Sequence, residues 1–139
     1  MKHILLPIDG STRSLRTIDT VKQTYSPDAV SVTILTVLPD YTPIDGQFDR
    51  ERQERKTLGE LDTFAKLLDG WTVDTAIVRG TPGLEIVENA KNHPTDVIVM
   101  TRSSRGPLHK LGSVATYLVR NAQFVDLIVL RENEEDEGA

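Results

Sequence analysis

The chain alternates between two patterns of hydrophobic and polar positions. Short apolar runs rich in β-branched residues predict strands, because such side chains fit a pleated and buried surface. The predicted strands cover residues 4–8, 29–38, 71–78, 96–100 and 125–130. Between these runs, apolar residues recur three or four positions apart, which predicts helices with one buried face.

Local signals place the helices. The first follows Ser11 or Thr12, either of which can cap it, and the third begins at Pro82 with Thr81 as its cap. The second helix is predicted over residues 48–68 and the fourth over residues 113–122. The core-facing residues predicted from the spacing in the first three helices are Leu15, Ile18, Val21, Leu58, Leu61, Phe64 or Ala65, Leu68, Leu84, Ile86, Val87 and Ala90.

Strands that alternate with helices of this length predict a parallel sheet with right-handed crossovers. The unbroken apolar run at residues 97–100 is typical of a strand covered on both faces. We therefore expect an α/β fold, a doubly wound and Rossmann-like three-layer α/β/α sandwich. Its sheet has about five strands in the order 3-2-1-4-5.

Composition narrows the class of protein. The chain has 139 residues and no linker-like stretch, which favours a single domain. It has no cysteine, which excludes disulfides and thiolate metal sites, and its three histidines show no metal-ligand spacing. No run of 18 apolar residues occurs, and the apolar stretch before Pro7 is too short for a signal peptide. These features predict a cytoplasmic protein without a metal site.

Charge is distributed unevenly along the chain. The net charge is −5, but residues 132–139 carry five acidic residues and no basic one. Residues 1–131 are therefore neutral overall, and we expect them to form the domain, followed by a disordered acidic tail over 132–139. The charged run 49–56 alternates in sign, which suits an exposed helix face and argues against nucleic-acid binding.

The predicted strand order also predicts a binding site. Ligands of such sheets bind outside the carboxyl ends of the strands where the order reverses, here between the first and fourth strands. Asp9 follows the first strand, and Arg102 and Arg105 follow the fourth. Gly112 and Ser113 then open a helix, whose free N–H groups and positive dipole end attract phosphate.

A structural interpretation of the same residues stays open. Asp9 could cap the turn after the first strand, and Ser113 is a favoured residue type at a helix start. Arg102 and Arg105 could be solvated surface charges.

The chain resembles the universal stress protein family over almost its whole length. The residues that carry the resemblance are 4–11, 80–82, 96–100, 112–114 and 127–130. The resemblance implies the sandwich fold, a cytoplasmic location, a role in stress survival and a homodimer. The last strand, residues 125–131, is apolar and lies at the predicted sheet edge, which also favours pairing with a second chain there.

Family members that bind ATP carry a loop of the form G-x2-G-x9-G-[ST] after the fourth strand. Here Thr101 and Ser104 stand at the first two glycine positions, and seven residues separate Ser104 from Gly112. Only Gly112 and Ser113 match. Threonine disfavours the backbone geometry that glycine allows, so the loop departs from the pattern in shape as well as in length.

Two interpretations therefore stay open. In the first, the protein binds ATP or AMP, with Mg at the phosphates, and the resemblance together with the strand-end argument selects the site residues Pro7, Asp9, Val37, Met100, Arg102, Arg105, Gly112, Ser113 and Val114. In the second, it binds no nucleotide and acts as a dimeric protein-interaction or signalling module. No pair of residues in the sequence indicates a nucleophile with its base, and Ser113 has no obvious histidine partner, so we expect no enzyme activity beyond slow ATP hydrolysis at most.

Overall fold

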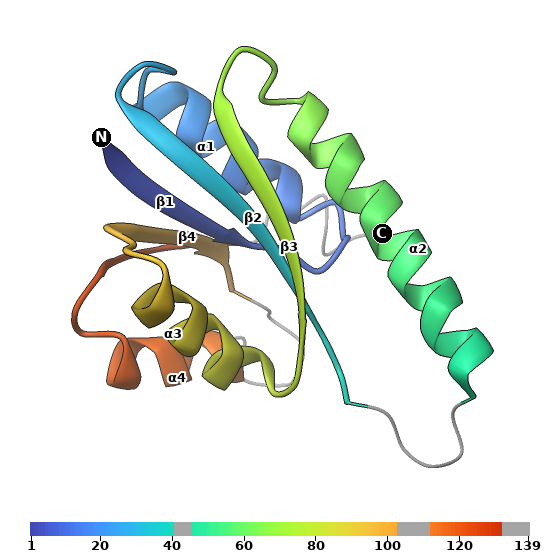
Figure 1. Cartoon of the computed structure of the whole chain (residues 1–139). Helices are drawn as coiled ribbons and strands as arrows, with labels where there is room; N and C mark the ends of the chain where they lie inside the picture. Colours follow the sequence, from blue (N-terminus) through green and yellow to red (C-terminus); the bar gives the residue numbers. More distant parts are fainter. Residues whose placement is uncertain (41–45, 103–111, 132–139) are drawn as a thin grey trace.

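Five parallel strands form one sheet in the order β3-β2-β1-β4-β5 in the computed structural model, which describes residues 1–40, 46–102 and 112–131 (Figure 1). The strands are β1 (Lys2–Pro7), β2 (Val30–Leu38), β3 (Thr72–Arg79), β4 (Val97–Thr101) and β5 (Asp126–Leu130). The helices are α1 (Ser14–Thr24), α2 (Gln47–Lys66), α3 (Pro82–Asn92) and α4 (Ser113–Asn121). The predicted strand order is confirmed.

Helices cover both faces of the sheet, so the predicted three-layer sandwich is also confirmed (Figure 1). On one face, α1 and α2 pack on the sheet through residues such as Ile18, Leu61 and Phe64. On the other face, α3 and α4 pack through residues such as Val87 and Leu118. Among the helices that the structure describes, none combines the length and the apolar character needed to cross a membrane.

The centre of the sheet is its most buried part. β1 pairs in parallel with β2 on one side and with β4 on the other, and Leu5 lies opposite Ile98. Ile4 and Leu6 point to the α1 and α2 face, whereas Leu5 points to the α3 and α4 face, because successive side chains alternate across a strand. Each fully buried aliphatic side chain contributes about 1.5–3 kcal/mol to the stability of the fold. The strands β1 and β4 therefore anchor the sheet.

The predicted helix faces are each wrong at one position. Leu15, Leu58 and Leu84 were expected in the core, but they are 41%, 54% and 44% exposed. In each helix the residue just before the leucine is buried instead, and these residues are Ser14, Thr57 and Gly83. The buried stripe of each helix thus keeps its other predicted members but begins one residue earlier, at a small side chain.

The capping predictions had mixed outcomes. Thr81 is the N-cap of α3 and Pro82 lies in its first turn, as expected, although no side-chain cap bond is formed. The prediction that Ser11 or Thr12 caps α1 is wrong, because Arg13 occupies the N-cap position. The carbonyls of Ser11 and Thr12 instead accept hydrogen bonds from the N–H groups of the residues three positions later, which forms a turn before the helix.

Gly83 should be required for the contact between α3 and α4. A Cβ atom at this position would lie 2.8 Å from Cδ1 of Tyr117, close to the rigid base of that ring. We expect Gly83→Ala to lower the free energy of unfolding by about 1–3 kcal/mol in urea denaturation, because the two helices must separate. Gly59→Ala is the matched control, since Gly59 lies in α2 with open space around it. It should raise stability by about 0.5–1 kcal/mol, and equal effects of both changes would contradict this account.

Candidate functional site

A pocket of about 200 Å³ lies at the carboxyl ends of β1, β2 and β4. The starts of α1, α3 and α4 surround it, which brings segments from the whole length of the chain to one place. Its lining consists of Pro7, Ile8, Asp9, Ser14, Leu35, Val37, Pro82, Ile86, Met100, Thr101, Gly112, Ser113, Val114 and Ala115. The pocket therefore occupies the point where the strand order reverses, between β1 and β4.

Seven of the residues predicted for the site line this pocket together. They are Pro7, Asp9, Val37, Met100, Gly112, Ser113 and Val114. Arg102, which follows β4, is not part of the lining. Arg105 lies outside the residues that the structure describes.

The inner wall of the pocket is apolar. Leu35, Ile86 and Met100 belong to the core cluster beneath α3 and α4, and Val37 and Val114 pack against it. A wall of this kind can hold the face of an aromatic ring, because ring faces bury well against aliphatic side chains. It offers no charge of its own, so charged parts of a ligand must lie elsewhere.

The N-terminus of α4 supplies a polar end to the pocket. Gly112 is the N-cap in an extended conformation, and its carbonyl accepts a hydrogen bond of 2.9 Å from the N–H of Thr116. The first N–H groups of any helix have no partner within the helix, and among the described residues no side-chain cap bond or first-turn acidic residue takes them up. Ser113, the first helical residue, is exposed. This end therefore suits an anion.

Asp9 lies at the rim of the pocket and already has several partners. Its Oδ1 accepts hydrogen bonds from the N–H of Ser11 at 2.9 Å and from Oγ of Ser14 at 3.4 Å. Its Oδ2 pairs with Nη2 of Arg13 at 3.2 Å. Partial burial raises the pKa of Asp9, but the hydrogen bonds from Ser11 and the charge of Arg13 outweigh it, so the pKa is lowered. Asp9 is therefore ionised and organises the turn into α1 as well as lining the pocket.

One side-chain nitrogen of Arg102 has no partner in the described part of the chain. Its backbone N–H donates to the carbonyl of Leu130 at 2.9 Å, which continues the pairing of β4 with β5. Its side-chain Nε is buried and has no hydrogen-bond partner among the described residues. Buried donors are normally satisfied, so this guanidinium is a candidate for contact with a ligand. Within the same ranges, no three His, Asp or Glu side chains gather as metal ligands would.

Half of the pocket lining consists of residues that were not predicted from the sequence. The missed residues are Ile8, Ser14, Leu35, Pro82, Ile86, Thr101 and Ala115. Some had a signal, because Thr101 ends the fourth strand and Pro82 begins a helix at the same sheet edge. Leu35 and Ile86 showed only apolar periodicity, which does not distinguish a pocket wall from ordinary core.

Comparison with known proteins identifies relatives over the full domain. The sequence model of the universal stress protein family matches residues 1–131. Universal stress protein MJ0531 of Methanocaldococcus jannaschii is 28% identical over 144 residues, which cover 96% of this chain and 85% of the relative.

Solved structures share the fold. The hypothetical protein MJ0577 superposes with a TM-score of 0.83 at 24% identity, covering 96% of this chain and 97% of the other. A universal stress protein in complex with cAMP has a TM-score of 0.75 at 19% identity, with coverage of 95% and 98%. A family member from Arabidopsis thaliana with AMP bound also has a TM-score of 0.75, at 18% identity, with coverage of 98% and 95%.

The ionised form of Asp9 should contribute to stability above acidic pH. Because folding lowers the pKa of this carboxyl below its usual 3.8, the contribution is present above that value and is lost as pH falls through the folded-state pKa. We expect Asp9→Asn to be less stable than the wild type in urea denaturation at neutral pH. The difference should shrink at about pH 3. A difference that stays constant across this range would show that the charge of Asp9 is not involved.

Proposed function

The chain belongs to the universal stress protein family, and we propose that it binds an adenine nucleotide in the pocket between β1 and β4. The observation that carries the proposal is the junction of an apolar wall with the open N-terminus of α4 in one pocket. The two ligands in the structural relatives, cAMP and AMP, share adenine and ribose and differ in the phosphate. These two ligands support the proposal that the present chain recognises the adenosine part of a nucleotide.

Each part of the nucleotide has a matching group. The adenine ring lies against the apolar wall, with Val37 and Met100 at its edges. The ribose lies by Pro7 and Asp9, whose carboxylate accepts hydrogen bonds from hydroxyl groups. The phosphate lies at the first turn of α4, where N–H groups near Gly112 and Val114 and the hydroxyl of Ser113 can donate.

Two arginine side chains that follow β4 support the proposed position of the phosphate. The Nε of Arg102 has no partner within residues 1–40, 46–102 and 112–131, and a phosphate oxygen is a suitable acceptor for this donor. Arg105 is part of the same proposal from its place in the sequence.

The volume of the pocket suggests that it encloses only part of the nucleotide. Its volume of about 200 Å³ is smaller than the roughly 300–1,000 Å³ of sites that enclose a whole ligand. The base and ribose therefore occupy the pocket, and the phosphates lie at its mouth. If ATP binds, Mg would accompany its phosphates and neutralise part of their charge. The site binds the nucleotide and does no chemistry beyond slow hydrolysis, and the cytoplasm is its compartment.

Binding can be tested directly. The protein is purified without added nucleotide and denatured, and the supernatant is analysed by anion-exchange chromatography, followed by calorimetric titration with AMP and ATP. We expect adenine nucleotide in the supernatant or heat of binding. Asp9→Ala and Ser113→Ala should each weaken binding about tenfold, since each removes a hydrogen bond to a polar or charged group of the ligand.

Ser26→Ala is the control, because Ser26 is exposed in the turn before β2 and does not line the pocket. Absence of nucleotide together with absence of heat would contradict the proposal. That outcome would favour the other interpretation, a dimeric protein-interaction or signalling module.

We also propose a homodimer formed through residues 125–131. β5 is an edge strand that pairs with β4 alone among the described strands. Asp126 donates its N–H to the carbonyl of Asp96, and the carbonyl of Leu130 accepts from Arg102. Because backbone groups alternate in direction along a strand, those of Leu127 and Val129 point away from β4. An edge of this kind can pair with a second chain.

Val129→Pro tests this interface. Proline removes the outward N–H but no bond to β4, so the variant should stay folded by circular dichroism and become a monomer by light scattering at micromolar concentration. Val129→Ala keeps the N–H and should stay a dimer. If Val129→Pro is folded and still a dimer, the interface lies elsewhere. If the wild type is a monomer, the proposed homodimer is wrong.

A further inference from the structure

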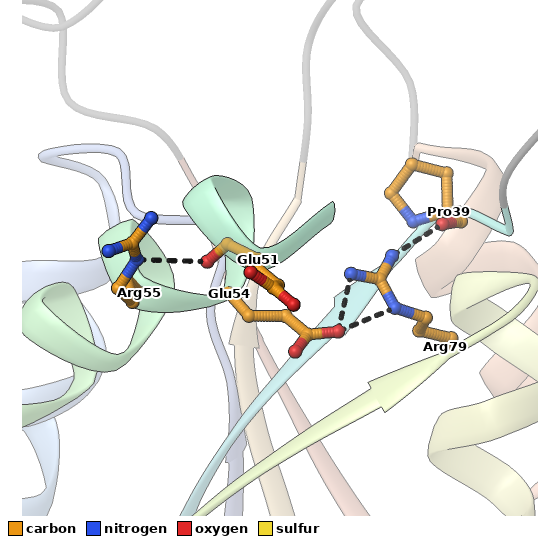
Figure 2. A network of polar contacts seen from close by, with 5 residues as sticks. All are labelled: Pro39, Glu51, Glu54, Arg55 and Arg79. Carbon is orange, nitrogen blue, oxygen red and sulfur yellow. Dashed lines mark hydrogen bonds and ion pairs between the residues drawn. The ribbon is translucent and has the colours of Figure 1, made fainter. Parts of the chain in front are cut away.

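Arg79 connects three elements of the fold. It is the last residue of β3, and its Nε and Nη2 donate to Oε1 of Glu54 on α2 at 3.1 and 2.8 Å. Its Nη1 donates to the carbonyl of Pro39, just after β2, at 3.1 Å (Figure 2). One guanidinium therefore holds α2, the end of β2 and the end of β3 together.

The contact is partly shielded from water. The side chain of Arg79 is only 14% exposed, whereas that of Glu54 is 44% exposed. Two N–H donors meet one carboxylate oxygen, and charge-assisted bonds of this kind are stronger than neutral ones. The ion pair of Arg79 is therefore expected to contribute more to stability than a fully exposed ion pair, which commonly contributes little.

The sequence of α2 explains why such a link is needed. The run from Asp49 to Lys56 contains no hydrophobic residue, whereas Leu61, Phe64 and Leu68 bury the later part of the α2 segment against the sheet. Polar contacts therefore attach this stretch to the rest of the domain, and the pair between Glu54 and Arg79 reaches the sheet directly.

The same link is close in sequence to two residues that line the pocket. Val37, two residues before Pro39, and Pro82, three residues after Arg79, both line it. The N–H of Gly80 also donates to the carbonyl of Leu38 at 2.9 Å, so the two strand ends are joined by a backbone bond beside the guanidinium. Arg79 itself is not part of the lining.

We propose that Arg79 is a positioning residue for the adenosine part of the ligand. By holding Glu54 and the Pro39 carbonyl, it sets the separation between Val37 and Pro82, and so the width of the pocket. This inference rests on the proposed nucleotide binding. It predicts that loss of the link weakens the binding of adenosine, AMP and ATP by the same factor. All three ligands share the adenosine part, and the phosphates bind at the other end of the pocket.

The experiment compares Arg79→Gln with the wild type by calorimetric titration of adenosine, AMP and ATP. We expect all three dissociation constants to rise by a common factor, about tenfold within the two- to thirtyfold range of such indirect effects. Glu54→Gln should raise all three dissociation constants by a similar common factor. Arg55→Gln is the matched control, since Arg55 donates to the Glu51 carbonyl of its own helix and should leave binding unchanged (Figure 2).

A second control separates positioning from general loss of stability. Val21→Ala removes a fully buried methyl pair on α1, outside the pocket lining, and lowers stability without touching the link. With every variant confirmed as folded, Val21→Ala should keep the wild-type dissociation constants. If it weakens binding as much as Arg79→Gln does, Arg79 has only a structural role and the inference is wrong.

The remaining outcomes are distinguishable. If the wild type binds and Arg79→Gln binds within twofold of it, this inference is overturned while nucleotide binding stands. If Arg79→Gln weakens the binding of ATP but not that of adenosine, the link acts on the phosphate end of the pocket and the inference is again wrong. If the wild type binds none of the three ligands, both proposals fail.

Discussion

Burial of β1 and β4 on both faces is the constraint from which the rest of the structure follows. Parallel neighbours cannot be joined by a tight turn, so a helix must cross over between each pair of consecutive strands. The crossovers from β1 to β3 place α1 and α2 on one face, and those from β3 to β5 place α3 and α4 on the other. The helices therefore diverge at the carboxyl ends of β1 and β4, and that divergence opens the pocket.

The character of the pocket has the same origin. Its wall is apolar because it is the exposed end of the core under α3 and α4, and its mouth is polar because α4 starts there. Topology thus brings the described residues of the pocket together. Thr101 lines the pocket although the ATP-binding pattern of the family has glycine at that position.

Polar contacts stabilise the parts of the domain that apolar packing does not reach. Asp9 organises the turn from β1 into α1 by accepting hydrogen bonds from Ser11 and Ser14 and pairing with Arg13. Arg79 links α2 to the ends of β2 and β3, beside a run of α2 from Asp49 to Lys56 that contains no hydrophobic residue. Both contacts lie close to the pocket, so local order there depends on charge more than it does at the centre of the sheet.

The sequence by itself determined the kind and order of the elements, because the periods of strands and helices are local. With the rule that ligands lie at strand ends, it also brought Asp9, Met100 and Ser113 to one site. Only the tertiary structure decided which helix residues are buried, as Ser14, Thr57 and Gly83 show. It alone placed Leu35 and Ile86 in the pocket wall and Arg79 against Glu54, 25 residues away. The physical reason is that helix rotation and side-chain reach are set by the elements packed against each residue, and no local pattern encodes them.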